Sequence, residues 1–439
     1  MDSRAPDSDT FSTFTYDDAD VEALSMTRLE RAIFEYFGER CTLSKLGEGG
    51  YHKVPYYYLH IPTSALIRTV KFYNIVTPAD FKIPDVFVRV ASSAFPKDKM
   101  LSEVATLRYI SAYTSIPVPR VYAWNTNTSN PVGADYMIME KFFYAIDTRN
   151  RSIRQQVEIS AAKYQAEGCN AGAEHLAALF SLRFQQAGSF YPLEDEDSKK
   201  AKVGPIVSLP FYRMLDGLRG SFTSASEYLA TPLHVKLIEA DRLRQDVLLD
   251  ISGEDPVSKL EYAKRVLRQA VGLCQYCPGD ATIPTTISTP DRPFSFLLDD
   301  FRLVNILIDE ENGQINGYID SEGTTIAPLW QVATAPQWIP DPNGDTANWY
   351  GGTPEDQRAL WSAFHQTMDE HDTTGDWRKA YELGEPYREF AGRLDLGFQQ
   401  WDERMESWLA RRLEWAEKHP GVGIPGGVLI ETPNKMTGE

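Results

Sequence analysis

The chain has 439 residues, of which 42% are hydrophobic and 24% charged, so it has ordinary globular composition and room for two or three packed subdomains. Its 62 acidic and 44 basic residues give a formal net charge of −18, which disfavours non-specific binding to nucleic acid or to an anionic membrane. We therefore expect neither as a partner, whereas a cationic small molecule or simple solubility fits this charge.

Several features of the chain bear on its compartment. No apolar run reaches the roughly 18–20 residues that a membrane-spanning helix needs. Residues 1–20 are rich in Asp, Ser and Thr and contain a single basic residue, Arg4, unlike a secretory signal or a mitochondrial presequence. The 4 cysteines do not make a disulfide framework in a chain this long, which favours a reducing compartment. The sequence predicts a cytoplasmic protein with a disordered segment 1–20.

The first part of the chain mixes helices with strands. Residues 21–37 and 98–115 carry apolar side chains at helical spacing, and Ile116-Pro-Val-Pro119 ends the second helix because proline cannot continue it. Segments that predict strands lie at 56–61, 65–72, 86–90, 120–124 and 136–140.

From about residue 150 the pattern becomes mainly helical, with predicted helices at 153–167, 171–186, 233–250, 257–274, 355–371, 376–384 and 386–418. The sequence therefore predicts an α+β fold of two lobes. Residues 21–140 form a small N-lobe with an antiparallel sheet, residues 141–420 form a larger, mostly helical C-lobe, and residues 421–439 form a flexible tail.

The most informative motif is Asp300, followed by Asn305 and, after a predicted hairpin, by Asp320. Apolar runs at 304–309 and 315–320 flank Glu310-Glu-Asn-Gly313, which is a turn sequence with a glycine available for positive φ. Asp-x-x-x-x-Asn, then a hairpin, then Asp is the arrangement with which kinase-like enzymes build a phosphoryl-transfer centre. The alternative is a set of ordinary acidic residues at strand ends.

Two further elements fit a nucleotide site. Leu46-Gly-Glu-Gly-Gly-Tyr51 predicts a glycine-rich turn between strands, through which backbone N–H groups approach phosphate oxygens. Arg89 is a cation on an apolar strand, and Glu103 lies in the next helix, where a kinase-like lobe needs a carboxylate to hold that cation. Lys71 is an alternative cation. It lies farther from Glu103 in the sequence than the usual step from a strand through a loop into the next helix.

These motifs occur in one succession with Ile116-Pro-Val-Pro-Arg-Val-Tyr-Ala-Trp124, Tyr136-Met-Ile-Met-Glu140 and Ala327-Pro-Leu-Trp330. Together they resemble the phosphotransferase enzyme family, which is aminoglycoside phosphotransferase-like, in its fungal form. The resemblance spans roughly residues 43–340 and implies a bilobal protein-kinase-like fold. It also implies an ATP- or GTP-dependent kinase that uses Mg²⁺ and phosphorylates a hydroxyl of a small molecule. That acceptor could be an aminoglycoside, a choline-like alcohol or a secondary metabolite.

The resemblance also implies roles for individual residues. Asp300 would orient the acceptor hydroxyl and take its proton, while Asn305 and Asp320 would coordinate Mg²⁺. Arg89 and Glu103 would engage the phosphates. The remaining residues would contact the nucleotide: the glycine-rich turn would cover it, and the inter-lobe strand would hydrogen-bond its base through the backbone (Gly47, Gly49, Gly50, Tyr51, Met139 and Glu140).

Some positions depart from the family pattern. The histidine that usually stands two residues before the catalytic aspartate, mainly as a scaffold, is Leu298 here. The tryptophan that commonly follows the second aspartate is Ser321, and residues 55–85 are longer than a simple strand connection. These departures, with Arg89 at a position where lysine is usual, leave a pseudokinase as the alternative, acting as a nucleotide-binding or interaction module. Glu322 is a candidate for an outer contact of the metal site.

Two other functions are less favoured. Cys274-Gln-Tyr-Cys277 is a lone C-x-x-C without a second pair at zinc spacing, which favours two unrelated thiols over a redox or metal site. A protein kinase would carry Asp-Phe-Gly and Ala-Pro-Glu signatures, and neither follows Asp320. The sequence leaves open the acceptor, the choice between ATP and GTP, and the oligomeric state.

Overall fold

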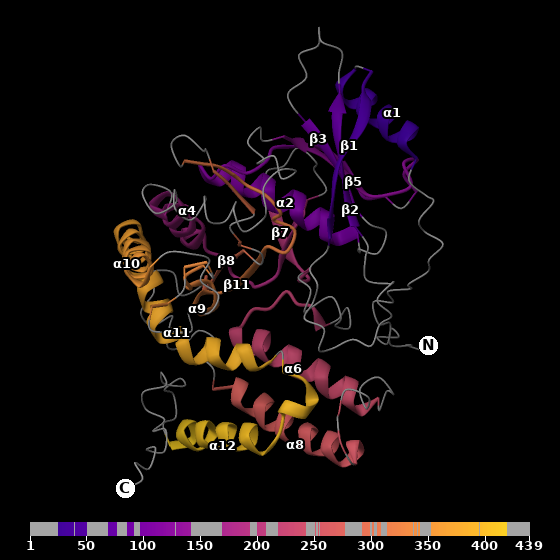
Figure 1. The fold of residues 1–439 in the computed structure, drawn as a ribbon. Coiled ribbons are helices and arrows are strands. Elements are labelled where there is room, and N and C mark those ends of the chain that lie inside the picture. Colours follow the sequence, from indigo (N-terminus) through magenta and orange to yellow (C-terminus); the bar gives the residue numbers. More distant parts are fainter. Residues whose placement is uncertain are drawn as a thin grey trace, which may run out of the picture.

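The computed structural model describes residues 25–38, 40–50, 69–76, 86–91, 97–127, 129–141, 169–193, 200–207, 218–242, 251, 253, 255–276, 292–298, 301–302, 305–308, 314–336, 338–339, 341–342, 353–394 and 396–418. Their elements form two lobes, with a strand-rich part at the top of Figure 1 and a mainly helical part below it. This arrangement confirms the predicted fold class.

The N-terminal lobe is built on a five-stranded antiparallel sheet in the order β1-β2-β3-β5-β4. Helix α1 (Met26–Phe37) packs on the sheet through Leu29 and Ile33, begins at the N-cap Ser25 and ends at Gly38, whose φ of 78° suits glycine. The strands are β1 (Thr42–Gly50), β2 (Thr69–Val76), β3 (Val86–Val90), β4 (Val121–Asn125) and β5 (Tyr136–Glu140).

Helix α2 (Lys97–Tyr113) lies between the two lobes and is apolar on two faces. Met100, Val104 and Leu107 pack with residues of β5 in a small buried cluster beneath the sheet. Ala105 and Ile110 instead belong to the main core of the C-terminal lobe. Because α2 is buried on both sides, its polar residues have fixed positions relative to both lobes.

The C-terminal lobe consists of helices and short two-stranded ladders, in which β6 pairs with β7, β8 with β11, and β9 with β10. Figure 1 shows α6, α8 and α12 in its lower part. The elements are α4 (Cys169–Ser181), β6 (Ser189–Pro192), β7 (Ala201–Gly204), α6 (Ala225–Asp241), α8 (Pro256–Cys274), β8 (Phe294–Leu297), β9 (Ile306–Ile308), β10 (Ile315–Tyr318), β11 (Thr325–Pro328), α9 (Leu329–Val332), α10 (Pro354–His371), α11 (Asp376–Arg393), the 3₁₀ turn η7 (Phe398–Gln400) and α12 (Glu403–Lys418).

Some predicted boundaries were wrong. The strand predicted at 65–72 is β2 at Thr69–Val76, and the helix predicted at 171–186 ends at Ser181 because Phe184 already pairs with Phe294 in an extended bridge. The four-residue strands β6, β7, β8 and β11 were not predicted, since each is too short to show an alternating pattern. The segments predicted at 56–61 and 153–167 lie outside the described residues.

The predicted helix break at Pro386 was also wrong, because α11 continues through this proline to Arg393. Its buried residues Trp377, Tyr387 and Phe390 lie on both sides of Pro386, so packing of the whole helix outweighs the roughly 3 kcal/mol that an internal proline costs. Helix α11 ends at Arg393, and the 3₁₀ turn η7 lies between it and the start of α12 at Glu403.

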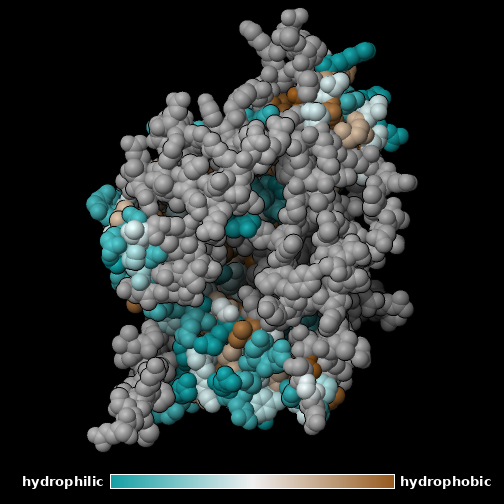
Figure 2. All heavy atoms as spheres, in the orientation of Figure 1, coloured by the Kyte–Doolittle hydropathy of each residue, from teal (hydrophilic) through white to brown (hydrophobic). Residues whose placement is uncertain are grey.

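The surface of the C-terminal helices is mainly hydrophilic where Figure 2 colours it, in the lower part of that view. Among the described residues, none of the helices combines the length and the apolar character needed to cross a membrane.

Candidate functional site

The two candidate metal ligands lie at one end of a short hairpin. Strands β9 and β10 pair antiparallel, as the apolar runs on both sides of the turn sequence predicted. Asn305 directly precedes β9, and Asp320 follows β10 by two residues. The backbone N–H of Ile319 donates to the carbonyl oxygen of Asn305 at 2.9 Å. This bond places the backbones of the two candidate ligands side by side.

Asp320 has an unusual backbone conformation, with a φ of 63°. Non-glycine residues seldom adopt positive φ, although aspartate tolerates it better than most, and such a conformation persists where the surroundings impose it. The Asp320 side chain is 38% exposed, so its carboxylate is open to solvent on one side.

Arg89 of β3 joins the two lobes through carboxylates. Its Nη1 lies 2.5 Å from Oε1 of Glu103 on α2, and its Nη2 lies 3.7 Å from Oδ1 of Asp320. The same Nη2 donates to Glu322, two residues beyond Asp320. Arg89 is 6% exposed and Glu103 2%, so the pair is buried. The strand cation and the helix carboxylate chosen from the sequence are therefore in contact, next to one candidate metal ligand.

Sequence reasoning missed a second cation, Lys99. It lies four residues before Glu103, so both side chains project from the same face of α2. Its Nζ is 3.0 Å from Oε1 of Glu322, and it is 4% exposed. Lysine at this helical spacing from Glu103 was the available signal. Glu322, considered only as an outer contact, bridges the two cations.

Burial and charge act together on these groups. Burial raises the pKa of Glu103 to about 7 although Arg89 opposes the shift. Burial also lowers the pKa of Lys99 despite the attraction of Glu322. Burial alone would raise the pKa of Glu322, but the positive charges of Arg89 and Lys99 outweigh burial and hold this pKa below the ordinary value. Burial would lower the pKa of Arg89, but the Glu103, Glu322 and Asp320 carboxylates together raise it.

Helix α2 is also tied to the C-terminal lobe at its first turn. Both Nη atoms of Arg219 bond Oδ2 of Asp98, at 3.0 and 3.1 Å, and Nη1 also donates to the carbonyl of Ile206 at 3.2 Å. Tyr191 of β6 donates to Asp98 at 3.4 Å. These bonds fix the end of α2 that carries Lys99 and Glu103.

The glycine-rich segment is partly placed. Gly47, Gly49 and Gly50 lie within β1 and pair with Phe72, Val70 and Thr69 of β2, with an irregularity between Lys45 and Gly47. The prediction of a glycine-rich turn at Leu46-Gly-Glu-Gly-Gly-Tyr51 was therefore wrong up to Gly50, because strand pairing continues to that residue. Tyr51 lies outside the described residues.

The inter-lobe strand was predicted with the bounds that β5 has, Tyr136–Glu140. Met139 is 5% exposed and packs in the cluster with α2, whereas the backbone N–H of Glu140 donates to the carbonyl of Arg120 at 2.8 Å. A nucleotide base would therefore find the Glu140 N–H already engaged.

Asp300 lies outside the described residues, but Leu298, two positions before it, and Phe301, directly after it, are placed. Both pack against the main hydrophobic core. The ring of Phe301 lies 5.7 Å from that of Tyr318, which ends β10. Leu298 thus contributes apolar packing at the position where the family usually has histidine.

A histidine that the sequence did not single out reaches this hairpin. Nδ1 of His175 on α4 lies 2.8 Å from the hydroxyl of Tyr318. The two residues are 143 positions apart, so no local sequence signal joins them.

The lone C-x-x-C motif shows no reactive thiol in its described part. Cys274 ends α8, is 2% exposed, and its Sγ–H donates to the carbonyl of Ala270 at 3.4 Å. Burial raises its pKa to about 12, which opposes thiolate formation. Cys277 lies outside the described residues.

The donor set at the hairpin fits a hard cation. Asn305 and Asp320 offer amide and carboxylate oxygens, and Mg²⁺ prefers oxygen ligands completed by water and substrate phosphate. In the part of the chain that the structure describes, no group of three His, Cys, Asp or Glu side chains could hold a metal by itself.

No family model matches the chain. Among curated proteins, it is 28% identical over 178 residues to a subtelomeric hrmA-associated cluster protein of Aspergillus fumigatus, over 39% of this chain and 30% of that protein. It is 27% identical over 177 residues to altered inheritance of mitochondria protein 9, mitochondrial, of Yarrowia lipolytica, over 34% of this chain and 30% of that protein. The match thus spans less than a third of the length of these relatives.

Solved structures similar to this chain include small-molecule phosphotransferases. A candidate aminoglycoside phosphotransferase of Ralstonia eutropha has 11% identity and a TM-score of 0.41, over 88% of this chain and 98% of that one. A choline kinase of Cryptosporidium parvum has 11% identity and a TM-score of 0.35, over 90% and 94%. Spectinomycin phosphotransferase, solved with ADP and spectinomycin, has 11% identity and a TM-score of 0.36, over 91% and 96%. Each of these identities is 11% and each TM-score is below 0.5, so the likenesses carry no argument about the activity of this chain.

Proposed function

We propose that the protein is a nucleotide- and Mg²⁺-dependent kinase that transfers a γ-phosphoryl group to a hydroxyl of a small molecule. The observation that carries this proposal is the position of Arg89. A buried guanidinium on the central sheet, held by Glu103 of α2, lies 3.7 Å from Asp320 of the opposite lobe. Phosphoryl transfer needs a fixed cation beside a metal-binding carboxylate.

In this proposal the chain acts mainly by positioning and by charge. Arg89 would bind nucleotide phosphate oxygens with its planar fork, while Glu103 keeps the guanidinium in place. Asn305 and Asp320 would hold Mg²⁺, which would neutralise charge that develops on the phosphates. Asp300 would orient the acceptor hydroxyl and accept its proton.

The nucleotide would be ATP or GTP, bound between the lobes. The glycines of β1 would cover its phosphates, and backbone groups at and after Glu140 would meet the base, chiefly carbonyl oxygens, because the Glu140 N–H already donates to Arg120. The acceptor would be an amino sugar, a choline-like alcohol or a secondary metabolite. We place the protein in the cytoplasm as part of the same proposal.

The test is thermal unfolding with ATP or GTP, each with and without Mg²⁺. A ligand that binds only the native state raises the melting temperature, by an amount that corresponds to about 2.7 kcal/mol at 100 times Kd. We expect a Mg²⁺-dependent rise in the wild type that is lost in Asp320→Asn. The exposed Glu417→Gln serves as a control because it also removes one negative charge.

Catalysis is tested separately by ADP or GDP release with a panel of aminoglycosides, amino alcohols and sugars. We expect Asp300→Asn to abolish turnover while the Mg²⁺-dependent rise in melting temperature remains. The absence of any rise with either nucleotide at millimolar concentration would refute the kinase.

The second candidate, a pseudokinase, is favoured by one specific feature of the site. Both Nη atoms of Arg89 already contact carboxylates, of Glu103 and Glu322, so phosphate has to compete for the guanidinium. A Mg²⁺-dependent rise in melting temperature without turnover of any acceptor in the panel would support this reading.

A further inference from the structure

The hairpin that carries Asn305 and Asp320 is small, and its geometry has to be fixed from outside. Its ladder contains a register irregularity between Ile315 and Gly317, and β9 is only 3 residues long. An isolated two-stranded hairpin is marginally stable by itself. The positive φ of Asp320 adds local strain, which only persists if the flanking residues are held.

Tyr318 is the residue at which this support converges. Its backbone N–H donates to the carbonyl of Pro117, in the loop that follows α2, at 2.9 Å. Its ring lies against Phe301, the residue directly after Asp300. Its hydroxyl bonds Nδ1 of His175 on α4 at 2.8 Å. Tyr318 therefore ties the metal hairpin to three separate segments of the chain.

The bond to His175 is the polar part of this support. Tyr318 is 8% exposed, and a buried hydroxyl without a partner costs about 1–3 kcal/mol. The ring of Tyr318 is therefore most stable where its hydroxyl meets Nδ1. Because Ile319 and Asp320 follow directly, a shift of Tyr318 is transmitted to the metal-binding carboxylate.

We infer that His175 is a positioning residue, which through the hydroxyl of Tyr318 fixes the hairpin that presents Asn305 and Asp320 to a metal. The inference rests on the proposed function of this site. In this inference His175 acts by holding Tyr318. Leu298, whose side chain is apolar, offers no side-chain hydrogen bond that could do the same.

The test measures the Mg²⁺ concentration that gives half of the nucleotide-dependent rise in melting temperature. Outer contacts of metal ligands typically change metal affinity by about 10–100-fold when they are removed. We expect His175→Ala and the nearly isosteric Tyr318→Phe each to raise this concentration about tenfold. The double variant should be no worse than either single variant, because all three remove the same bond.

Two comparisons separate positioning from packing. His175→Asn, which places an amide atom near the position of Nδ1, should restore most of the Mg²⁺ affinity. His371→Ala removes a histidine on α10 that also faces α4, 3.7 Å from Glu174, and should leave the Mg²⁺ dependence unchanged. Nucleotide binding without Mg²⁺ should be the same in all variants.

The outcomes are distinct. If His175→Ala and Tyr318→Phe lower the melting temperature of the free protein but leave the half-maximal Mg²⁺ concentration unchanged, the bond serves packing alone and the inference is wrong. If the wild type shows no Mg²⁺-dependent rise at all, the proposed function is wrong, and this inference falls with it.

Discussion

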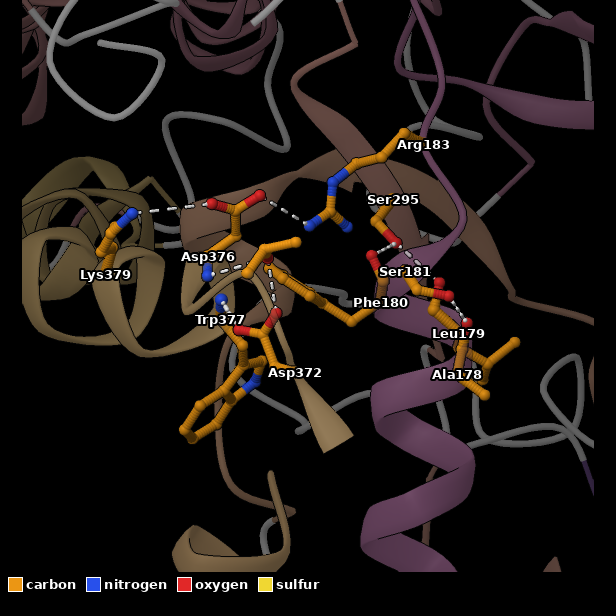
Figure 3. Close-up of polar contacts among 11 residues, drawn as sticks. Ala178, Leu179, Phe180, Ser181, Arg183, Ser295, Asp372, Asp376, Trp377 and Lys379 are labelled. Atoms are coloured by element: carbon orange, nitrogen blue, oxygen red, sulfur yellow. Dashed lines mark hydrogen bonds and ion pairs between the residues drawn. The ribbon is translucent and has the colours of Figure 1, made fainter. Parts of the chain in front are cut away.

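A buried ion pair between Arg183 and Asp376 provides a quantitative test of how the C-terminal lobe is held together. Arg183 follows α4, and Asp376 begins α11, so the pair joins two helices far apart in the sequence (Figure 3). Their Nη2 and Oδ2 atoms are 3.6 Å apart, and the side chains are 8% and 1% exposed. Within the described part of the chain, Nε and Nη1 of Arg183 have no hydrogen-bond partner. We therefore expect Asp376→Asn to be strongly destabilising.

The magnitude follows from distance and burial. Two unit charges 3.6 Å apart interact by about 5 kcal/mol at an effective dielectric constant of 20. Removing one partner of a buried pair typically costs about 3–5 kcal/mol, because the remaining charge stays buried without compensation. Burial already lowers the pKa of Arg183, with Asp376 as the main opposing charge. Asp376→Asn should thus cost about 3–5 kcal/mol of unfolding free energy.

Urea unfolding followed by tryptophan fluorescence measures this cost, since Trp377 lies next to Asp376 and is 2% exposed. Lys379→Met is the control: its Nζ is 3.9 Å from Asp376 but its side chain is 41% exposed, so a change within about 0.5 kcal/mol is expected. Replacing both partners, Arg183→Met with Asp376→Leu, should cost less than Asp376→Asn alone. A cost below about 1 kcal/mol for Asp376→Asn would refute the reasoning.

Three further predictions concern single side chains. Burial, and then Arg378, lower the pKa of His365, so the free energy of unfolding should decrease as pH falls below about 6.5. Urea titrations at several pH values should show a weaker pH dependence for His365→Gln. Burial raises the pKa of Cys274 to about 12, so its thiol should react with a disulfide reagent at pH 8 only after unfolding, as mass spectrometry would show. Gly384→Ala should destabilise by about 1–3 kcal/mol in urea despite alanine's higher helix propensity, because the new Cβ would lie 2.7 Å from Cβ of Trp330.

The sequence predicted well those elements whose pattern is set locally. The hairpin at β9 and β10 was predicted because two apolar runs flank a turn sequence, and β5 because four consecutive apolar residues precede Glu140. Helix α2 was predicted nearly to the residue, since Pro117 and Pro119 end it. In each case the pattern of neighbouring residues is enough to predict the element.

Elements decided by distant contacts were not predicted. The sequence around Phe184 does not predict that the chain becomes extended there, because the bridge partner, Phe294, is 110 positions away. The continuation of α11 through Pro386 depends on buried residues that pack against other elements. The glycines of β1 favour a turn locally, yet their backbone groups pair with β2 up to Gly50.

The candidate site shows the same division. Arg89 and Glu103 could be paired from the sequence because one strand and one helix separate them, and the structure places them in contact. Lys99 and Glu322 were not paired, since they are 223 positions apart and neither has a motif of its own. His175 was missed for the same reason. The functional meaning of these contacts stays a proposal that the experiments above test.

The charges at the site argue for a ligand that brings positive charge. Arg89 and Lys99 face carboxylates of Glu103, Asp320 and Glu322, so both buried cations are already engaged. A nucleotide without a metal would bring further negative charge next to these carboxylates, and an uncompensated charge in a buried place is costly. A divalent cation on the exposed side of Asp320 would offset that charge beside the phosphate oxygens. Under the proposed function, we therefore expect nucleotide binding to depend on Mg²⁺.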